Sequence, residues 1–365
     1  MPSPAPRDTR FRDDITGLRT IAILAVVLVH AGVTWLPGGF VGVDVFFVIS
    51  GFLITAHLLR EAEATGRIDL IAFWARRLRR LFPALVAATV ATCVIAALIF
   101  SPLELRGLAF EGGATVLSVA NILFAQQATD DFGHDVQQSP LLHMWSLGAE
   151  EQFHLALPIV VLIVAFAARR LRMKLRTVLA VALVAVFVVS LAASVYVTDN
   201  HPFWAFYTLP TRAWEFTVGG LVALALGSRT MPKSWGSLSV WIGLGLIASS
   251  CLFIQASDAF PGLIAAVPVV GSALIIAGGS AEAPPSKLIG SAPMKWIGER
   301  SYSWYLCTGR PSSLLPPRST RSLCGSVSPQ PGHHWGSRTT RTTGSSPQSV
   351  NHLGSREAQA PYTSP

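Results

Sequence analysis

The feature that most constrains this chain is a series of eight apolar runs, each about 20 residues long, separated by polar segments. An α-helix of about 20 apolar residues spans the hydrocarbon core of a bilayer. Only 13% of the residues are charged and the mean hydropathy is +0.49, which excludes a soluble globular domain. We therefore expect an all-α, polytopic transmembrane helix bundle. The runs lie at about 15–36, 40–59, 81–100, 143–167, 177–197, 210–227, 237–255 and 261–279.

Basic residues mark one side of this bundle. The segment 60–80 contains the four arginines of FWARRLRRLFP, and a second basic cluster, 169–176, follows the fourth apolar run. By the positive-inside rule both segments are cytoplasmic, and the N-terminus lies on the same side. The basic residues of 229–233 and 287–295 keep this register. The pattern predicts a multi-pass protein of the cell inner (plasma) membrane with a cytoplasmic N-terminus.

The segment 104–126 is ambiguous. Its apolar part is about 14 residues once three charged residues are set aside, below the roughly 17 that a crossing needs. The cytoplasmic basic segments on either side require an even number of crossings between them, and the runs 81–100 and 143–167 supply two. We interpret 104–126 as re-entrant or interfacial.

The first run contains LRTIAILAVVLVH, which carries Arg19 near its start and His30 at its end. Eleven residues are close to three helical turns, so both side chains share one helix face about 16 Å apart along the axis. Ionisable residues inside a membrane are costly and are functional-site candidates by default.

Three further groups of polar residues are candidates. The basic run places Arg76 and Arg77 on the helix face of Arg80, and paired guanidiniums bind phosphates. The alternative is a stop-transfer cluster or a lipid-headgroup anchor.

No P-loop, HExxH or CxxC pattern is present, so we expect no metal site.

The second group lies in HMWSLGAEEQFH, where helical spacing forms one polar stripe from which Glu151 points about 100° away. A buried carboxylate beside histidines can orient an imidazole or hold its proton. The alternative is an interfacial helix start whose polar residues face water. The stripe consists of His143, Ser146, Glu150 and His154.

The third group lies in YTLPTRAWEF, where Arg212 and Glu215 are spaced to pair and so lower the cost of their burial. Asp44, in the second run, either faces the same cavity or lies at the outer interface.

Five stretches resemble, in order, the sequence blocks of the integral-membrane acyltransferase family 3, which comprises bacterial O-acyltransferases. The similarity covers about residues 12–306. The stretches PGGFVGVDVFFVISGFLIT and RAWEF also resemble those of a subgroup in which an SGNH hydrolase-like domain follows the last span. The stretches are ITGLRTIAILAVVLVH, GGFVGVDVFFVISGFLIT, FWARRLRRLFPAL, HMWSLGAEEQF and YTLPTRAWEF.

The resemblance implies transfer of an acyl group, often acetyl, from cytoplasmic acyl-CoA to a hydroxyl of a cell-surface glycan, glycolipid or peptidoglycan precursor. It implies that His30 is the essential histidine, with Arg19 as its partner. We expect His30 to act as general base on the acceptor hydroxyl, and the alternative is a transient acyl carrier. It assigns Glu150 to the family's glutamate. The phosphates of CoA would lie on Arg77 and Arg80, with Arg76 beside them, and no cofactor would be bound permanently. The partners would be the bilayer, acyl-CoA and a carbohydrate or glycolipid acceptor, with no nucleic acid.

The chain departs from the family after Leu306. IGERSYSWYL resembles the start of the last family span, which usually continues Trp-His-Trp-Pro, whereas this chain continues Cys-Thr-Gly-Arg. Loss of one G from the codons TGG CAC TGG CCG yields Cys-Thr-Gly-Arg. We therefore expect a leader at 1–14, a membrane acyltransferase domain at 15–306, and a disordered, basic, out-of-frame tail at 307–365 that replaces the final span.

A non-catalytic reading stays open. In a transporter-like protein or scaffold remnant the polar stripes would line a solute path, and loss of the final span would leave an inactive product. Transfer of label from acyl-CoA to an envelope glycan would separate the enzyme from this alternative.

Overall fold

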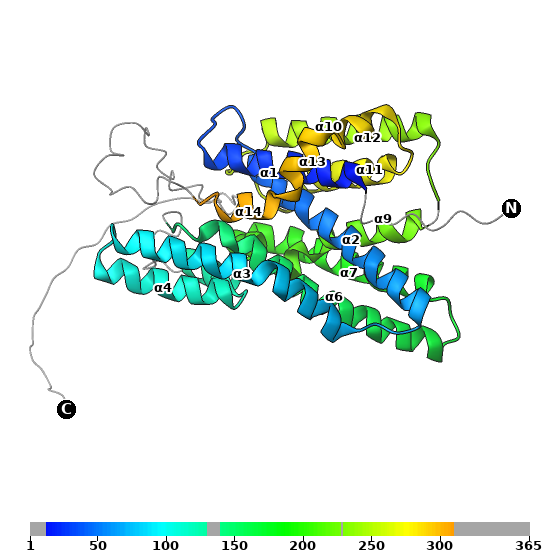
Figure 1. Ribbon diagram of the computed structural model, residues 1–365, viewed down its shortest axis with the longest axis horizontal. Helices are drawn as coiled ribbons and strands as arrows, with labels where there is room; N and C mark the ends of the chain where they lie inside the picture. Colours follow the sequence, from blue (N-terminus) through cyan, green and yellow to red (C-terminus); the bar gives the residue numbers. More distant parts are fainter. Residues whose placement is uncertain (1–11, 130–138, 228, 310–365) are drawn as a thin grey trace, which may run out of the picture. The chain divides into compact units, whose positions relative to one another are not determined.

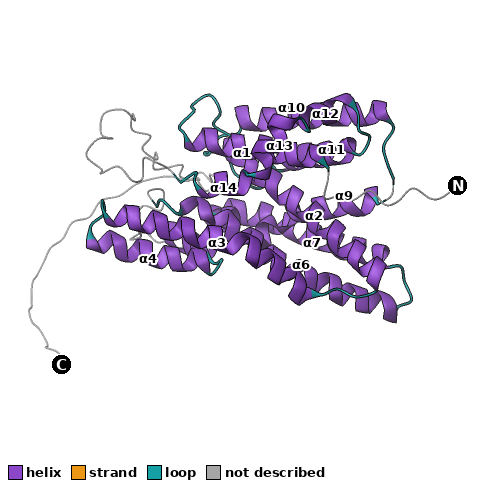
Figure 2. Ribbon diagram, in the orientation of Figure 1, coloured by secondary structure: helices purple, strands orange, loops and turns teal. Residues whose placement is uncertain are grey.

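The computed structural model describes residues 12–129, 139–227 and 229–309, and within these ranges the chain is helical with no β-strand (Figures 1 and 2). The expected all-α bundle is confirmed. The expected tail and the proposed change of reading frame lie almost entirely outside the described residues. The helices are α1 Asp13–His30, η2 Gly39–Val41, α2 Gly42–Thr65, α3 Leu70–Ala97, α4 Pro102–Val116, α5 Ala120–Thr129, η4 Leu142–Met144, α6 Trp145–Arg170, α7 Leu175–Asn200, α8 Pro202–Tyr207, α9 Leu209–Leu226, α10 Lys233–Phe253, α11 Ala266–Gly279, α12 Pro284–Ile289, α13 Ala292–Glu299 and α14 Ser301–Leu306.

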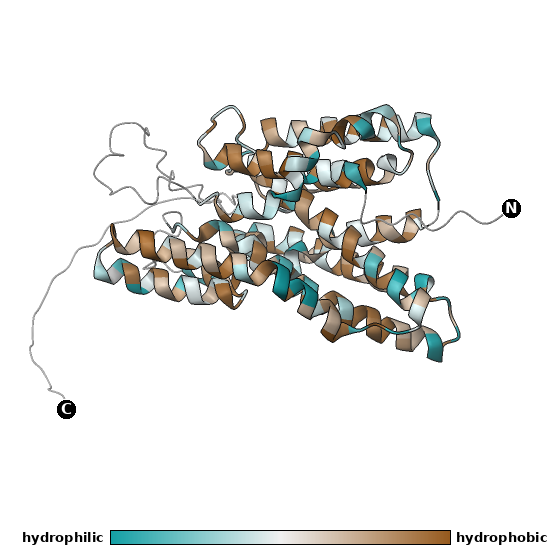
Figure 3. Cartoon of the chain, viewed as in Figure 1, coloured by the Kyte–Doolittle hydropathy of each residue, from teal (hydrophilic) through white to brown (hydrophobic). Residues whose placement is uncertain are grey.

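Five of the described helices are long and apolar enough to cross a membrane: α2, α3, α6, α7 and α10. Two more expected spans, α1 and α9, are 18 residues long but carry charged side chains, and α11 has only 14 residues. Figure 3 shows apolar residues along most of α3, α4 and α6, interrupted by hydrophilic stretches. The chain is a multi-pass membrane protein.

Helix α2 is the centre of the bundle. In its most apolar stretch 72% of the residues are buried, against 17% in α3 and 22% in α7, so those two helices lie at the periphery. Its backbone approaches α9 closely, because a Cβ at Gly51 would overlap the carbonyl oxygen of Phe216, and one at Gly219 that of Val48. Small residues permit such close approach between membrane helices.

The ends of two elements differ from the expectation. The third span begins at Leu70 and not at residue 81, because Asp69 caps it by accepting a hydrogen bond from the Ala72 amide at 2.9 Å. The basic run therefore lies inside α3 and not in a loop before it. Helix α1 begins at Asp13, so its first two residues lie within the segment expected to be the leader.

The ambiguous segment forms two short helices. Helix α4 has 15 residues and α5 has 10, so each is shorter than a typical span, and the re-entrant or interfacial placement stays a prediction. Helix α4 runs beside α3, where Gly112 lies against Thr89 and Cys93 (Figure 1). The turn between α4 and α5 contains Ser118, whose φ is 59° and whose carbonyl accepts a 3.0 Å hydrogen bond from Gln152 of α6.

Candidate functional site

The candidate site consists of two cavities. The first, which we call the arginine cavity, has a volume of about 530 Å³ and is lined by residues from α1, α2, α3, α6 and α14. The second, the histidine cavity, has a volume of about 290 Å³. The charged and histidine side chains lining the arginine cavity are Arg19, His57, Arg76, Arg77, Arg80, Glu150, Glu151, His154 and Glu299.

Arg77 is the best-connected cation of the arginine cavity. Its Nε donates to both carboxylate oxygens of Glu151 at 3.0 Å, and its Nη2 donates to Oε1 at 2.7 Å. The same Nη2 lies 3.6 Å from Oε1 of Glu150. Fork-like pairing of this kind orients a guanidinium strongly. The arginine expected to bind phosphate is thus held by a carboxylate.

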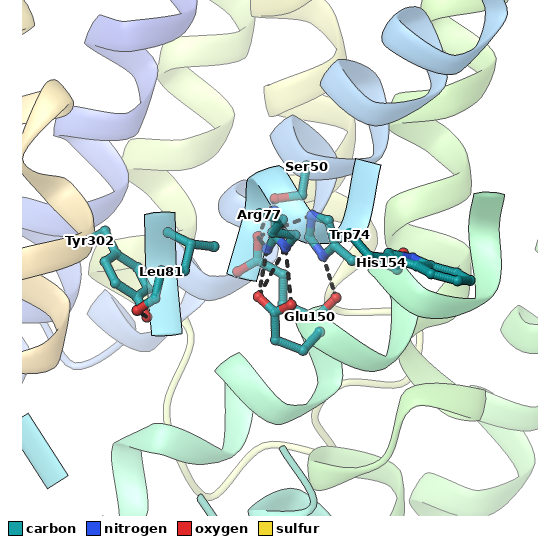
Figure 4. Close-up of polar contacts among 8 residues, drawn as sticks. Ser50, Trp74, Arg77, Leu81, Glu150, His154 and Tyr302 are labelled. Atoms are coloured by element: carbon teal, nitrogen blue, oxygen red, sulfur yellow. Dashed lines mark hydrogen bonds and ion pairs between the residues drawn. The ribbon is translucent and has the colours of Figure 1, made fainter. Parts of the chain in front are cut away.

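Glu150 lines this cavity and connects α6 with α2 and α3 (Figure 4). It accepts a hydrogen bond from Ser50 Oγ of α2 at 2.6 Å and faces Arg77 of α3. His154, one turn further along α6, places its Nε2 3.9 Å from Glu150 Oε1 and bonds through Nδ1 to the Glu150 carbonyl. Trp74 of α3 donates to the His154 carbonyl at 3.2 Å. The carboxylate of Glu150 therefore lies near the His154 ring, but no hydrogen bond joins the two side chains, because Nδ1 of His154 bonds to a backbone carbonyl.

The histidine cavity contains His30, at the C-terminal end of α1. Its Nδ1 lies 2.7 Å from the carbonyl oxygen of Val26, one turn earlier. A carbonyl only accepts hydrogen bonds, so Nδ1 carries a proton and Nε2 is the basic nitrogen of the neutral ring. The ring of His143 lies edge-on, with centroids 6.4 Å apart. Arg19 and His30 share α1, as expected, but they line different cavities.

Arg212 closes the floor of the histidine cavity. It pairs with Asp44 at 2.8 Å and with Glu215 at 2.9 Å, and the three side chains are at most 1% exposed. The expected pair is thus confirmed, and Asp44 joins it. Four aromatic rings surround the guanidinium, with centroids 5.3–5.8 Å from Cζ. Of the three charged residues only Arg212 lines either cavity, contrary to the placement considered for Asp44 and Glu215.

Tyr305 of α14 lies between the two cavities and lines both of them. Its hydroxyl donates to the carbonyl of His143 at 2.7 Å and lies 2.5 Å from Ser146 Oγ. The predicted stripe is therefore divided, because Ser146 lines the arginine cavity while His143 lines the histidine cavity. Sequence patterns did not single out Tyr305 or Glu151 as site residues. In the described part of the chain, no cluster of three potential metal ligands occurs.

Comparison with known proteins identifies the family of this site. Residues 12–308 match the family described as an acyltransferase domain. The chain belongs to this acyltransferase family. The match confirms the resemblance drawn from the sequence blocks, and it includes the arginine cavity, the histidine cavity and α14.

Two bacterial relatives are similar to the chain. The peptidoglycan O-acetyltransferase OatA of Listeria monocytogenes is 32% identical over 309 residues, covering 81% of this chain and 49% of the relative. The O-acetyltransferase OatA of Staphylococcus aureus is 41% identical over 152 residues, covering 42% of this chain and 25% of the relative. The chain thus spans about half the length of the Listeria protein. No solved structure matches it.

Proposed function

We propose that the chain transfers an acyl group, acetyl in the simplest case, from acyl-CoA to a hydroxyl of a cell-envelope glycan, glycolipid or peptidoglycan precursor. The observation that carries this proposal is the pair of cavities with the common wall Tyr305, one lined by four arginines and the other by the basic nitrogen of His30. The names of the relatives, which are O-acetyltransferases, support the same reaction class.

The arginine cavity suits the donor. Arg76 and Arg80 are exposed at its edge, where the phosphates of CoA can reach them without deep desolvation. Its volume of about 530 Å³ lies within the range of roughly 300–1,000 Å³ that is usual for small-molecule sites. Arg77 would exchange Glu151 for a phosphate, and Arg19 lies deeper, opposite Glu150. The pantetheine arm would run along α1 toward Tyr305.

The reaction needs a base on the acceptor side. In our proposal Nε2 of His30 takes the proton of the acceptor hydroxyl while the hydroxyl oxygen attacks the thioester carbonyl. A carbon–oxygen bond forms, the carbon–sulfur bond breaks, and the proton ends on the departing CoA thiolate. Glu150 would keep the guanidinium of Arg77 in place through its ion pair at 3.6 Å.

The proposed orientation follows from the ends of the helices. The mouth of the histidine cavity includes Phe203 and Asp258, which lie at the opposite end of the bundle from the basic residues of 169–176. With the basic end in the cytoplasm of an inner membrane, acyl-CoA would enter from inside and the acceptor from outside.

The change of reading frame after Leu306 is also a proposal, and resequencing the gene there tests it. If no alternative reading frame at this point encodes a hydrophobic span, the proposal is refuted.

Substitution of His30 tests the proposed function. His30→Ala should reduce transfer of labelled acetyl from acetyl-CoA to envelope glycan by at least about 100-fold, because general base catalysis contributes 10²–10⁴. The matched control is His201→Ala, because His201 is exposed at the end of α7 and lines neither cavity. Undiminished transfer by a correctly inserted His30→Ala protein would overturn the assignment. Solute flux without covalent transfer would favour the transporter-like alternative.

A further inference from the structure

The walls of the histidine cavity are rich in aromatic residues. Rings come from η2, α6, α8, the turn after α10 and α14, so the lining is assembled from segments far apart in the sequence. With a volume of about 290 Å³ the cavity is at the lower end of the roughly 300–1,000 Å³ usual for small-molecule sites, which suits one small ring and not an extended chain. The aromatic residues are Phe40, Trp145, Phe203, Phe206, Tyr207 and Phe260, together with the shared Tyr305.

The cavity has little net positive charge to offer an anion. Among the described residues that line it, Arg212 is the only arginine or lysine, and this side chain is already paired with two buried carboxylates. The other charged lining residue is Asp258 at the rim. The arginine cavity is lined by four arginines and three glutamates, and it differs because two of its arginines, Arg76 and Arg80, are exposed. An uncharged ligand fits the histidine cavity better than a phosphate or carboxylate.

One buried donor of Arg212 has neither a hydrogen bond nor an ion pair. Nη2 donates to Asp44, and Nε lies 2.9 Å from Glu215 as an ion pair without a hydrogen bond, but Nη1 has neither kind of partner although the side chain is 1% exposed. Leaving a buried donor unpaired is unfavourable, and such groups usually have a ligand or water as partner. Because Arg212 lines the cavity, an oxygen atom of a bound molecule can satisfy this donor.

We propose that the histidine cavity binds one uncharged sugar ring of the acceptor. A pyranose has an apolar face of C–H groups, which packs on aromatic rings, and a rim of hydroxyls, which needs a few fixed polar partners. Arg212 Nη1 donates to one of the sugar oxygens, and His30 faces the hydroxyl that receives the acyl group. This inference rests on the proposed function, since the ring is the acceptor of that reaction.

The mouth of the cavity shows where the sugar enters and which residue can be changed safely. Phe203 of α8 is 44% exposed, and Ala256 and Asp258 are exposed beside it, whereas Trp145 and Phe260 are each 6% exposed. Removing the ring of Phe203 therefore takes away part of the aromatic wall without opening the packed interior. The buried Arg212 is unsuitable as a first variant, because its loss would leave two carboxylates without their partner.

The test is protection of a cysteine placed at the mouth. The full chain with Ala256→Cys, in nanodiscs, is treated with a polar maleimide, and labelling of residue 256 is followed by mass spectrometry of its peptide. The probe is the tetramer of N-acetylglucosamine. We expect the probe to slow labelling of residue 256. We expect Phe203→Ala to raise the probe concentration needed for half-maximal protection by about fivefold, as loss of one aromatic contact implies.

Two controls make the test specific. Thr34→Cys, in the exposed turn after α1, lines neither cavity and should be labelled at the same rate with and without the probe. Phe253→Ala removes a ring that is 76% exposed at the end of α10 and lines neither cavity, so protection at residue 256 should be unchanged.

The outcomes separate this inference from the proposed function. Absence of protection, or protection unaffected by Phe203→Ala, would overturn the sugar site even if acyl transfer is observed. Protection by N-acetylglucosamine tetramer that Phe203→Ala weakens would support the site even if no acyl transfer is found. Equal protection by inorganic phosphate would overturn the assignment of an uncharged ligand.

Discussion

The two cavities differ in how far their ion pairs are exposed to water. In the arginine cavity, Arg77 and Glu151 are 22% and 24% exposed, so water reaches both members of the pair. At the floor of the histidine cavity, Arg212 is 1% exposed and its two carboxylates are 0% exposed. A partly hydrated ion pair can exchange partners, whereas a fully buried one holds its geometry because separating it leaves an uncompensated charge. The first arrangement suits a site that binds an anion, and the second suits a rigid wall.

The largest expected effect is on the buried cluster. Arg212→Leu should lower the free energy of unfolding by about 3–5 kcal/mol, because it leaves Asp44 and Glu215 buried without a cation. The measurement is the thermal unfolding of the purified chain in detergent. Arg176→Leu is the matched control, since Arg176 pairs with Glu63 at 2.7 Å but the two side chains are 45% and 38% exposed. That variant should lose less than about 1 kcal/mol. Equal losses in the two variants would contradict the distinction between the cavities.

The next largest expected effect is on CoA binding by the partly exposed Arg77 of the arginine cavity. Arg77→Ala should weaken binding of CoA by about 10- to 100-fold while the protein stays folded, because a hydrogen bond to a charged group contributes about 1.5–3 kcal/mol. Binding is measured by isothermal titration calorimetry of the purified chain.

The basic run offers its own control. Arg79 is exposed, bonds to the carbonyl of Ala75 within its own helix at 3.1 Å, and does not line the arginine cavity. Arg79→Ala should therefore leave CoA affinity unchanged. If Arg77→Ala and Arg79→Ala weaken binding equally, the basic run acts as a diffuse charge and not as a phosphate site.

Local periodicity predicted much of this site. The shared helix of Arg19 and His30, the pair of Arg212 with Glu215, and the placement of Arg80 in the cavity that also contains Arg77 all follow from 3.6 residues per turn. These features depend only on neighbours in one helix. The sequence blocks also predicted the acyltransferase family, which the comparison confirmed.

Contacts between distant segments could not be predicted in the same way. Asp44 meets Arg212 across 168 positions, and Tyr305 meets His143 across 162, so no periodic pattern connects them. For Glu151, helical periodicity predicted the direction of the residue but not its partner. Its Cα–Cβ bond does point away from the stripe of Glu150, but the long side chain of Arg77 reaches both carboxylates. The direction of the Cα–Cβ bond determines where a short side chain lies. It does not determine which residues a long, flexible partner such as arginine can reach.

The smallest predicted effect tests whether Glu151 competes with the donor. In the structure Glu151 occupies the fork of Arg77 that a phosphate would otherwise use. Glu151→Gln keeps the shape of the side chain but removes its charge, so the pairing that a phosphate must displace becomes weaker. We expect CoA to bind about two- to fivefold more tightly, as the modest energy of a partly exposed ion pair implies.

Calorimetric titration with CoA measures this change, and Glu63→Gln is the control, since Glu63 pairs with Arg176 and lines neither cavity. Weaker binding by Glu151→Gln would mean that the carboxylate orients Arg77 for the phosphate and does not compete with it. The arginine cavity would then resemble the histidine cavity, with an arginine fixed by acids, and the contrast between exchangeable and fixed charge would no longer hold. Tighter binding, combined with the loss in Arg77→Ala, would show that the same guanidinium alternates between a carboxylate and a phosphate.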